Sequence, residues 1–226
     1  MDRKGALRKI RALFRQFGPI SHVSRRYLNQ LTSGNLYELF CLSKVVEILT
    51  TNYGFQINFV GSSLKFQSGP GAIHQASPHF DVFVSGQIAP IYQIFTDIEF
   101  KTLGSSSTHF SPTHTDNSEH HEIDIVVVEP NLAGHPKFDQ IVLGVECKAH
   151  AVFIKATVKE VLGIRRELSF VDDPALGELS SKSSLLSKSV PANPCSEYWL
   201  AFLDPKGLSY QDSPKEFGID FLHWRP

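Results

Sequence analysis

The chain has 226 residues, of which 42% are hydrophobic, 20% charged and 11% aromatic, a composition typical of globular proteins. One domain is the default at this length, because such a chain buries roughly 70–75% of its unfolded surface and needs no disulfide or structural metal. The formal net charge of −1 excludes a global attraction to nucleic acid, so a polyanion would need a local basic surface.

The three cysteines predict a reducing compartment. Cys41, Cys147 and Cys195 are odd in number and far apart, unlike the cysteines of a disulfide-stabilised secreted domain. No segment approaches the roughly 18–20 apolar residues of a membrane span, and no signal-peptide core is present. We therefore expect a cytoplasmic protein with no membrane partner.

Residues 1–33 are interpreted as a basic, amphipathic helical arm. Apolar residues recur at helical spacing up to a stop near Gly18-Pro19, at Leu7, Ile10, Leu13, Phe14 and Phe17. Basic residues fill the same segment, at Arg3, Lys4, Arg8, Lys9, Arg11, Arg15, Arg25 and Arg26. The pattern fits a helix docked on the core, a phosphate-tracking arm, a membrane-surface helix or a transit peptide.

Residues 34–226 are expected to form the main domain, of class α/β. Apolar periodicity predicts helices over 35–51 and 151–170. Runs rich in β-branched and aromatic residues predict strands over 55–60, 80–84, 91–101, 121–128, 141–148, 198–203 and 219–222. Polar composition predicts a loop over 104–120 and a mobile loop over 172–195.

Two of these strands carry acids that interrupt apolar runs. Asp124 stands near the start of one strand, and Glu146 and Lys148 stand at the end of the next. Because side chains alternate along a strand, Glu146 and Lys148 share a face while Cys147 points the opposite way. If the strands pair, two carboxylates converge, which favours a hard cation such as Mg²⁺ or Mn²⁺. With an adjacent ammonium, this chemistry suits phosphodiester hydrolysis.

The pattern resembles the PD-(D/E)xK nuclease superfamily. The match consists of Glu38 on the early helix, Ile123-Asp124 for the first motif and Glu146-Cys147-Lys148 for the second, with Ile123 in place of the name-giving proline. The resemblance covers about 35–204 and implies a restriction-endonuclease-like αβββαβ core with a mixed central sheet flanked by helices. It also implies a metal held by Asp124, Glu146 and the carbonyl of Cys147, with Lys148 catalytic and Glu38 as an outer ligand.

Simpler interpretations exist for the same residues. Asp124, Glu146 and Lys148 could merely end exposed strands, and Glu38 could complete a helix-capping box with Asn35. A second frame, Asp81 followed by Glu99-x-Lys101, repeats the spacing, but a loop is expected after it where the pattern requires a helix. We expect that frame to form an earlier strand that flanks the active face.

Histidines near the predicted site raise the alternative of zinc. They are His109, His114, His120, His121 and His135. Their spacing matches no zinc motif, so solvated loop histidines are the simpler interpretation and contacts with substrate phosphate are the next. His150, on the predicted strand face of Lys148, is a candidate for a supporting role.

The expected function is that of a Mg²⁺-dependent endonuclease that cuts DNA. Four arginines are candidates for phosphate contacts: Arg165, Arg166, Arg8 and Arg15. Cleavage of both strands would require a homodimer or larger assembly, and a partner protein could supply specificity or activation. A bacterial restriction or anti-phage defence role fits a small nuclease. The alternatives are an inactive nucleic-acid-binding or assembly module, or a nuclease for branched DNA, transposon ends or RNA.

Overall fold

The computed structural model describes the chain except residues 1, 15–24, 64–68 and 108–116. Its helices are α1 (Arg3–Phe14), α2 (Arg25–Gln30), α3 (Ser33–Thr51), α4 (Leu103–Ser107), α5 (Lys155–Leu168), α6 (Glu178–Lys182) and α7 (Asp212–Lys215), with the 3-10 helices η1 (Asn117–Glu119), η2 (Phe138–Gln140) and η3 (Pro205–Tyr210). Its strands are β1 (Gln56–Val60), β2 (His79–Phe83), β3 (Tyr92–Lys101), β4 (His120–Val128), β5 (Ile141–Lys148), β6 (Phe170–Leu176), β7 (Ser189–Asn193), β8 (Glu197–Phe202) and β9 (Ile219–His223).

A mixed sheet of seven strands forms the centre of the described structure, in the order β1-β2-β3-β4-β5-β8-β9. The strands from β1 to β5 are antiparallel to their neighbours, and β5, β8 and β9 run parallel. Helix α5 lies in the crossover between the parallel strands β5 and β8. The α/β class and the mixed central sheet expected from the sequence are therefore confirmed.

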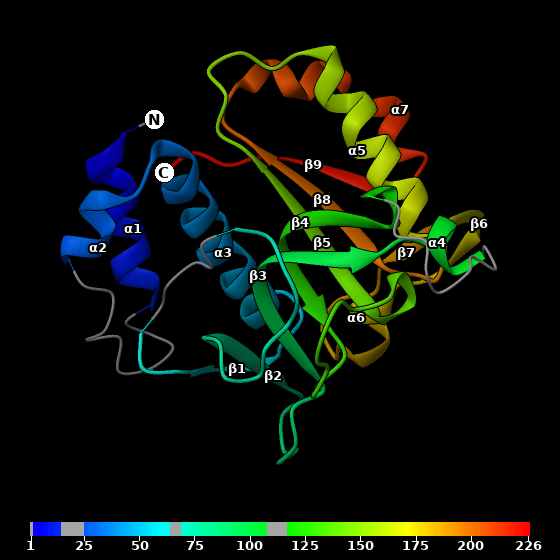
Figure 1. Cartoon of the computed structure of the whole chain (residues 1–226), viewed down its shortest axis with the longest axis horizontal. Helices are drawn as coiled ribbons and strands as arrows, with labels where there is room; N and C mark the ends of the chain where they lie inside the picture. The colour runs from blue at the N-terminus through cyan, green and yellow to red at the C-terminus, as the bar shows by residue number, and fades with distance from the viewer. Residues whose placement is uncertain (1, 15–24, 64–68, 108–116) are drawn as a thin grey trace.

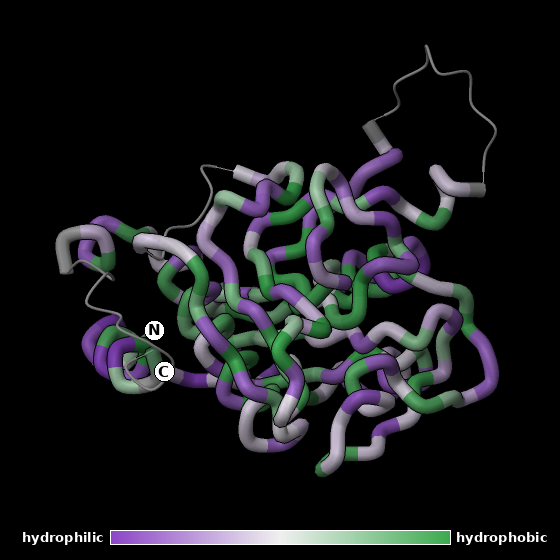
Figure 2. Tube along the Cα trace, turned by 90° about the horizontal axis from the view of Figure 1, so that it is seen from below, coloured by the Kyte–Doolittle hydropathy of each residue, from purple (hydrophilic) through white to green (hydrophobic). Residues whose placement is uncertain are grey.

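Helices cover the sheet on both faces (Figure 1). On one face α3 packs its apolar residues, such as Leu39 and Val46, against Leu143 and Val145 of β5. The opposite face is covered by α5. Apolar residues of this second core include Val126, Val161, Leu168, Tyr198 and Leu200. In Figure 2 many of the hydrophobic segments of the trace gather towards the centre of the molecule. Burial on both faces explains why these strands read as nearly continuous apolar runs.

Helix α1 packs against α3 and belongs to the first core. Its residues Ala6, Ile10 and Phe14 are buried, and Phe14 stacks on Phe80 of β2 at 5.8 Å between ring centroids. The apolar face of the basic arm is therefore covered by the core, as the docked-helix interpretation predicts. The expected helix end at Gly18-Pro19 lies outside the described residues.

The prediction of a loop over 172–195 is wrong. Strands β6 and β7 form a separate two-stranded sheet, and α6 lies between them in the chain. Every residue of β6 is exposed and each strand contains a proline, Pro174 or Pro191. Proline cannot donate to a strand ladder and is confined to edges, so composition alone indicated a loop. A short helix, α4, likewise stands within the expected loop 104–120.

Within the described residues, no helix combines the length and apolar character that crossing a lipid bilayer requires.

Candidate active site

Strands β4 and β5 separate at the centre of the sheet. Their ladder runs as far as the pair Ile125 and Val145, and Asp124 and Glu146 occupy the next position on each strand. Beyond that point β4 stays paired with β3, and β5 stays paired with β8. The two acids therefore face each other where the fork opens, and the convergence expected from the sequence is present.

Asp124 is tied to the strand that carries Glu146. The backbone N–H of Cys147 donates to Oδ2 of Asp124 at 2.6 Å. In an extended strand the N–H and C=O of one residue point to the same side, so the Cys147 carbonyl also points into the fork. Its thiol is buried in the core below α3, and burial, followed by the neighbouring Cys41, raises the pKa of the Cys147 thiol well above its usual range.

Lys148 stands between two carboxylates. Its Nζ lies 3.0 Å from Oε2 of Glu146 and donates to Oε1 of Glu160, on α5, at 2.8 Å. Burial lowers the pKa of Lys148, but Glu146 and the hydrogen bond to Glu160 outweigh it, so the ammonium stays charged. Sequence reasoning missed Glu160. The signal for it was present, because an acid in the middle of the helix that follows Lys148 can reach back to that strand.

Asp97 on β3 is a further acid that the sequence did not single out. The β3–β4 register on both sides of it places Asp97 opposite Asp124, so Asp97, Asp124 and Glu146 form one row across three strands. Asp97 adopts a φ of 56°, in the left-handed region, and its Oδ2 is buried without a hydrogen-bond partner. Burial, followed by the charge of Asp124, raises the pKa of Asp97 to about 7. Backbone strain of this kind is concentrated at functional sites.

Glu38 approaches the same acids from α3. Burial, followed by the charges of Asp124 and Asp97, raises the pKa of Glu38 to about 8. The helix begins at Ser33 and its N-cap is Thr32, whose side chain accepts from the N–H of Asn35 at 3.2 Å. The capping-box alternative for Glu38 is therefore wrong, because Asn35 already lies inside the helix.

The row of acids is strongly destabilised as a set of free anions. Burial is the largest cause of the raised pKa of both Asp124 and Glu146, and Asp124 raises that of Glu146 further. As the side chains stand, no three His, Cys, Asp or Glu residues in the described ranges form a ready metal-binding group. The donors nonetheless have the chemistry that a hard cation prefers, since Asp124, Glu146 and the Cys147 carbonyl all offer oxygen. The unpartnered oxygen of Asp97 lies in the same row.

A cleft of about 600 Å³ opens over this site, between β4, β5 and α5. Asp124, Glu146 and Lys148 lie on its floor, and Lys159 and Arg166 of α5 lie on its wall. The remaining lining residues are His121, Glu122, Glu160, Gly163, Ile164 and Glu167. An anionic substrate would meet cations on α5 and carboxylates on the strands.

The four arginines predicted to contact phosphate differ in their exposure and surroundings. Arg166 is exposed and lines the cleft, and Arg8 is exposed on α1. The prediction for Arg165 is wrong. It is buried, with Nε donating to the Phe217 carbonyl and Nη1 to the Ser196 carbonyl, both at 2.9 Å. Arg165 therefore fastens α5 to the loops before β8 and β9. Arg15 lies outside the described residues.

The residues of the competing frame, Asp81, Glu99 and Lys101, do not form one site. Asp81 pairs with Gln93 in the β2–β3 register and accepts from its amide at 2.8 Å. Glu99 lies six residues further along β3, a separation of roughly 20 Å along a strand. Lys101 is exposed at the end of β3. Asp81 and Glu99 therefore cannot share one cation, and their strands flank the active face as expected.

Two of the histidines near Asp124 contact each other, and one of them, His135, also lies 3.9 Å from a carboxylate oxygen of Glu99. The rings of His120 and His135 lie 4.6 Å apart, and burial, followed by His135, lowers the pKa of His120. His150 is exposed beyond the end of β5 and does not line the cleft. His109 and His114 lie outside the described residues.

The candidate site therefore combines a row of acids, one charged lysine and an open cleft. Its geometry draws on α3, β3, β4, β5 and α5. The chain matches no protein-family model, no curated protein and no solved structure.

Proposed function

We propose that this chain is a divalent-cation-dependent endonuclease of the PD-(D/E)xK type that hydrolyses phosphodiester bonds in DNA. The observation that carries the proposal is the fork of β4 and β5, where Asp124 and Glu146 face each other beside Lys148. If β1, β2, α4, β6, α6 and β7 are treated as additions, the remaining order α3, β3, β4, β5, α5, β8 is the αβββαβ order of a restriction-endonuclease-like core, which supports the proposal.

Asp124, Glu146 and the carbonyl of Cys147 would hold Mg²⁺ or Mn²⁺. When bound, the cation supplies Lewis-acid polarisation of the phosphoryl group and makes a water more acidic. Lys148 holds a positive charge beside the reacting phosphate, where it offsets developing negative charge and orients the attacking water. Glu38 accepts protons near neutral pH, so it serves as an outer group that exchanges protons with water.

The lining of the cleft supports a proposal for how the substrate binds and how the chain assembles. Arg166 and Lys159 on its α5 wall contact the phosphate backbone, which positions a strand without reading its sequence. Cleavage of both strands of a duplex requires two such sites, so the active form is a homodimer or a larger assembly. A partner protein supplies sequence specificity or activation, and a restriction or anti-phage defence role suits these parts.

The proposal is tested by incubating the purified chain with supercoiled plasmid, linear duplex, single strand and RNA in Mg²⁺ or Mn²⁺. Asp124→Asn should lose cleavage by about 100-fold or more, because it removes one of two charged ligands. Asp81→Asn is the matched control, since it makes the same change on β2, and it should cut like the wild-type protein.

Three results would count against the proposal. Equal cleavage by the wild-type protein and Asp124→Asn would reject the site, and loss of cleavage only in Asp81→Asn would favour the competing frame. Metal-independent binding without cleavage of any substrate would instead support an inactive nucleic-acid-binding module. Preference for a branched or RNA substrate would leave the chemistry intact and change the substrate class.

A further inference from the structure

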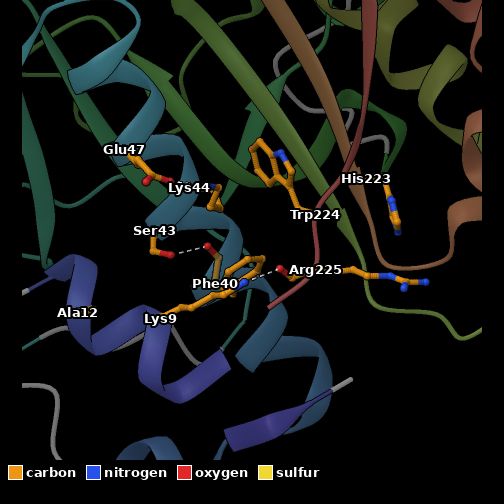
Figure 3. A pocket seen from close by; sticks show the side chains of 9 residues that line it. All are labelled: Lys9, Ala12, Phe40, Ser43, Lys44, Glu47, His223, Trp224 and Arg225. Atoms are coloured by element: carbon orange, nitrogen blue, oxygen red, sulfur yellow. Dashed lines mark hydrogen bonds and ion pairs between the residues drawn. The ribbon is translucent and has the colours of Figure 1, made fainter. Parts of the chain in front are cut away.

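A second concave site lies between α1, α3 and the residues after β9, as Figure 3 shows. This pocket has a volume of about 490 Å³. Its lining joins segments that are far apart in the chain: Lys9 and Ala12 from α1, Phe40, Ser43, Lys44 and Glu47 from α3, and His223, Trp224 and Arg225 from the end of β9 and beyond. We call it the Trp224 pocket.

Cations outnumber acids in the Trp224 pocket. Among its described lining residues Glu47 is the one acid, and it is ion-paired with Lys44. Lys9 donates to the carbonyl of Arg225 at 3.1 Å and lies 5.9 Å from the centroid of the Phe40 ring. Neither Lys9 nor Arg225 forms an ion pair with an acid of the described chain. Arg225 interacts electrostatically with Asp204, so among the described residues Lys9 carries the pocket charge that no acid offsets.

Trp224 contributes an indole to the same pocket. Its backbone is held by two hydrogen bonds: the Tyr37 hydroxyl donates to the Trp224 carbonyl at 3.2 Å, and the Trp224 backbone N–H donates to the Phe202 carbonyl at 3.1 Å. The Trp224 ring is half-buried and meets Trp199 edge-on at 6.3 Å between ring centroids. A partly exposed aromatic ring in a pocket with more cations than acids is a combination that suits single-stranded nucleic acid, in which bases stack and phosphates pair with charges.

The Trp224 pocket and the active-site cleft lie at the same end of the parallel strands. Lys148 pairs in register with Phe202 of β8, and Phe202 pairs with His223 of β9. Two strand spacings separate Lys148 from His223, or about 10 Å. Arg225 follows two residues later, about 7 Å further along the chain. At about 3.4 Å per stacked nucleotide, that path corresponds to roughly three to five nucleotides.

We propose that the Trp224 pocket binds one strand of the nucleic-acid substrate beyond the site of cleavage, with a base against Trp224, one phosphate at Lys9 and a neighbouring phosphate at Arg225, whose side chain points away from Lys9 in Figure 3. This inference rests on the proposed nuclease function. It adds a binding subsite on the α1 and α3 side of the sheet, outside the cleft that holds the reacting phosphate.

Affinity for a short labelled single strand, measured in EDTA by fluorescence anisotropy at several salt concentrations, tests the inference. Arg225→Gln and Lys9→Gln should each weaken binding about tenfold. Each should also reduce the slope of log affinity against log salt by about 0.7, the value for one lost phosphate contact. The matched control is Lys215→Gln, an exposed lysine on α7 before the opposite end of β9, which should change neither quantity.

The outcomes separate this inference from the proposed function. Plasmid cleavage with unchanged affinity and salt slope in both variants would overturn the subsite and leave the nuclease standing. Weakened binding in both variants without cleavage by the wild-type protein would reject the nuclease and keep a strand-binding pocket. Inorganic phosphate or a mononucleotide that binds as tightly as the strand would also overturn the subsite, because the pocket would then be a small-anion site.

Discussion

Lys148 is fixed from two elements at once, by Glu146 on its own strand and by Glu160 on α5. Such a clamp keeps the ammonium over the floor of the cleft, although a lysine side chain is flexible when free. The residue therefore combines a full positive charge with a defined position. Position is what separates a catalytic lysine from one that merely attracts an anion.

Lys148→Met should lower plasmid cleavage by about 100-fold or more, because the developing charge on the phosphate loses its counter-charge. Affinity for DNA should change little by comparison. The matched control is Lys159→Met, which removes an exposed ammonium from the wall of the same cleft. Initial rates and binding constants measured on all three proteins check this prediction. Equal losses of rate in both variants would show that Lys148 acts only through general charge.

Asp97 makes stability depend on pH. Its pKa is about 7 in the folded chain, while an unfolded aspartate titrates near 4. The folded state therefore keeps a proton that the unfolded chain loses, so the stability that Asp97 contributes is complete below about pH 4 and is lost as the pH rises through about 7. Glu38, with a pKa of about 8, acts in the same direction.

In EDTA the melting temperature of the wild-type protein should fall as the pH rises from about 5 to about 8. Asp97→Asn should make this fall shallower, because it removes one of the carboxyls with a raised pKa that titrate in this range. Thermal unfolding measured by circular dichroism at several pH values checks the slope. Parallel curves for the two proteins would show that Asp97 titrates normally in the folded state.

At the scale of elements, periodicity and composition located most of the central sheet. The expected helix over 35–51 is α3, and the runs over 121–128 and 141–148 are β4 and β5 within one residue at their ends. These elements are long, apolar and rich in β-branched residues, so local preference and burial agree. The antiparallel pair of β6 and β7 was missed because each strand contains a proline and every residue of β6 is exposed, so local preference and burial do not agree there.

Helix α1 should contribute to the stability of the whole fold, because its residue Ile10 is fully buried in the first core. Ile10→Ala should reduce the free energy of unfolding by about 2–5 kcal/mol, through lost burial and the cavity that remains. Arg8→Ala, on the exposed side of the same helix, should change it by less than about 0.5 kcal/mol. Urea denaturation measures both. A small effect of Ile10→Ala would mean that the arm is not part of the cooperative core.

At the scale of the molecule, the candidate site was readable from the sequence only where two elements adjoin in the chain. Asp124, Glu146 and Lys148 lie on consecutive strands joined by a turn, so pairing could be expected from order alone. Asp97 required the register of β3 against β4, across a connection of 18 residues that composition does not fix. Arg165 was mispredicted for a related reason. The sequence shows a basic residue on an amphipathic helix, but it does not show that backbone carbonyls distant in the chain bind the guanidinium.

The row of acids lies on β3, β4 and β5, the three central strands of the seven-stranded sheet, whereas the Trp224 pocket adjoins the edge strand β9. Central ladders open only when most of a domain unfolds, while edges open in local fluctuations. Rising urea should therefore abolish the contribution of the Trp224 pocket to strand binding before it abolishes cleavage. Simultaneous loss of both would show that edge and centre unfold as one unit. The strand would thus be bound at the edge of the sheet, which opens most easily, and cleaved at the centre of the sheet, which unfolds last.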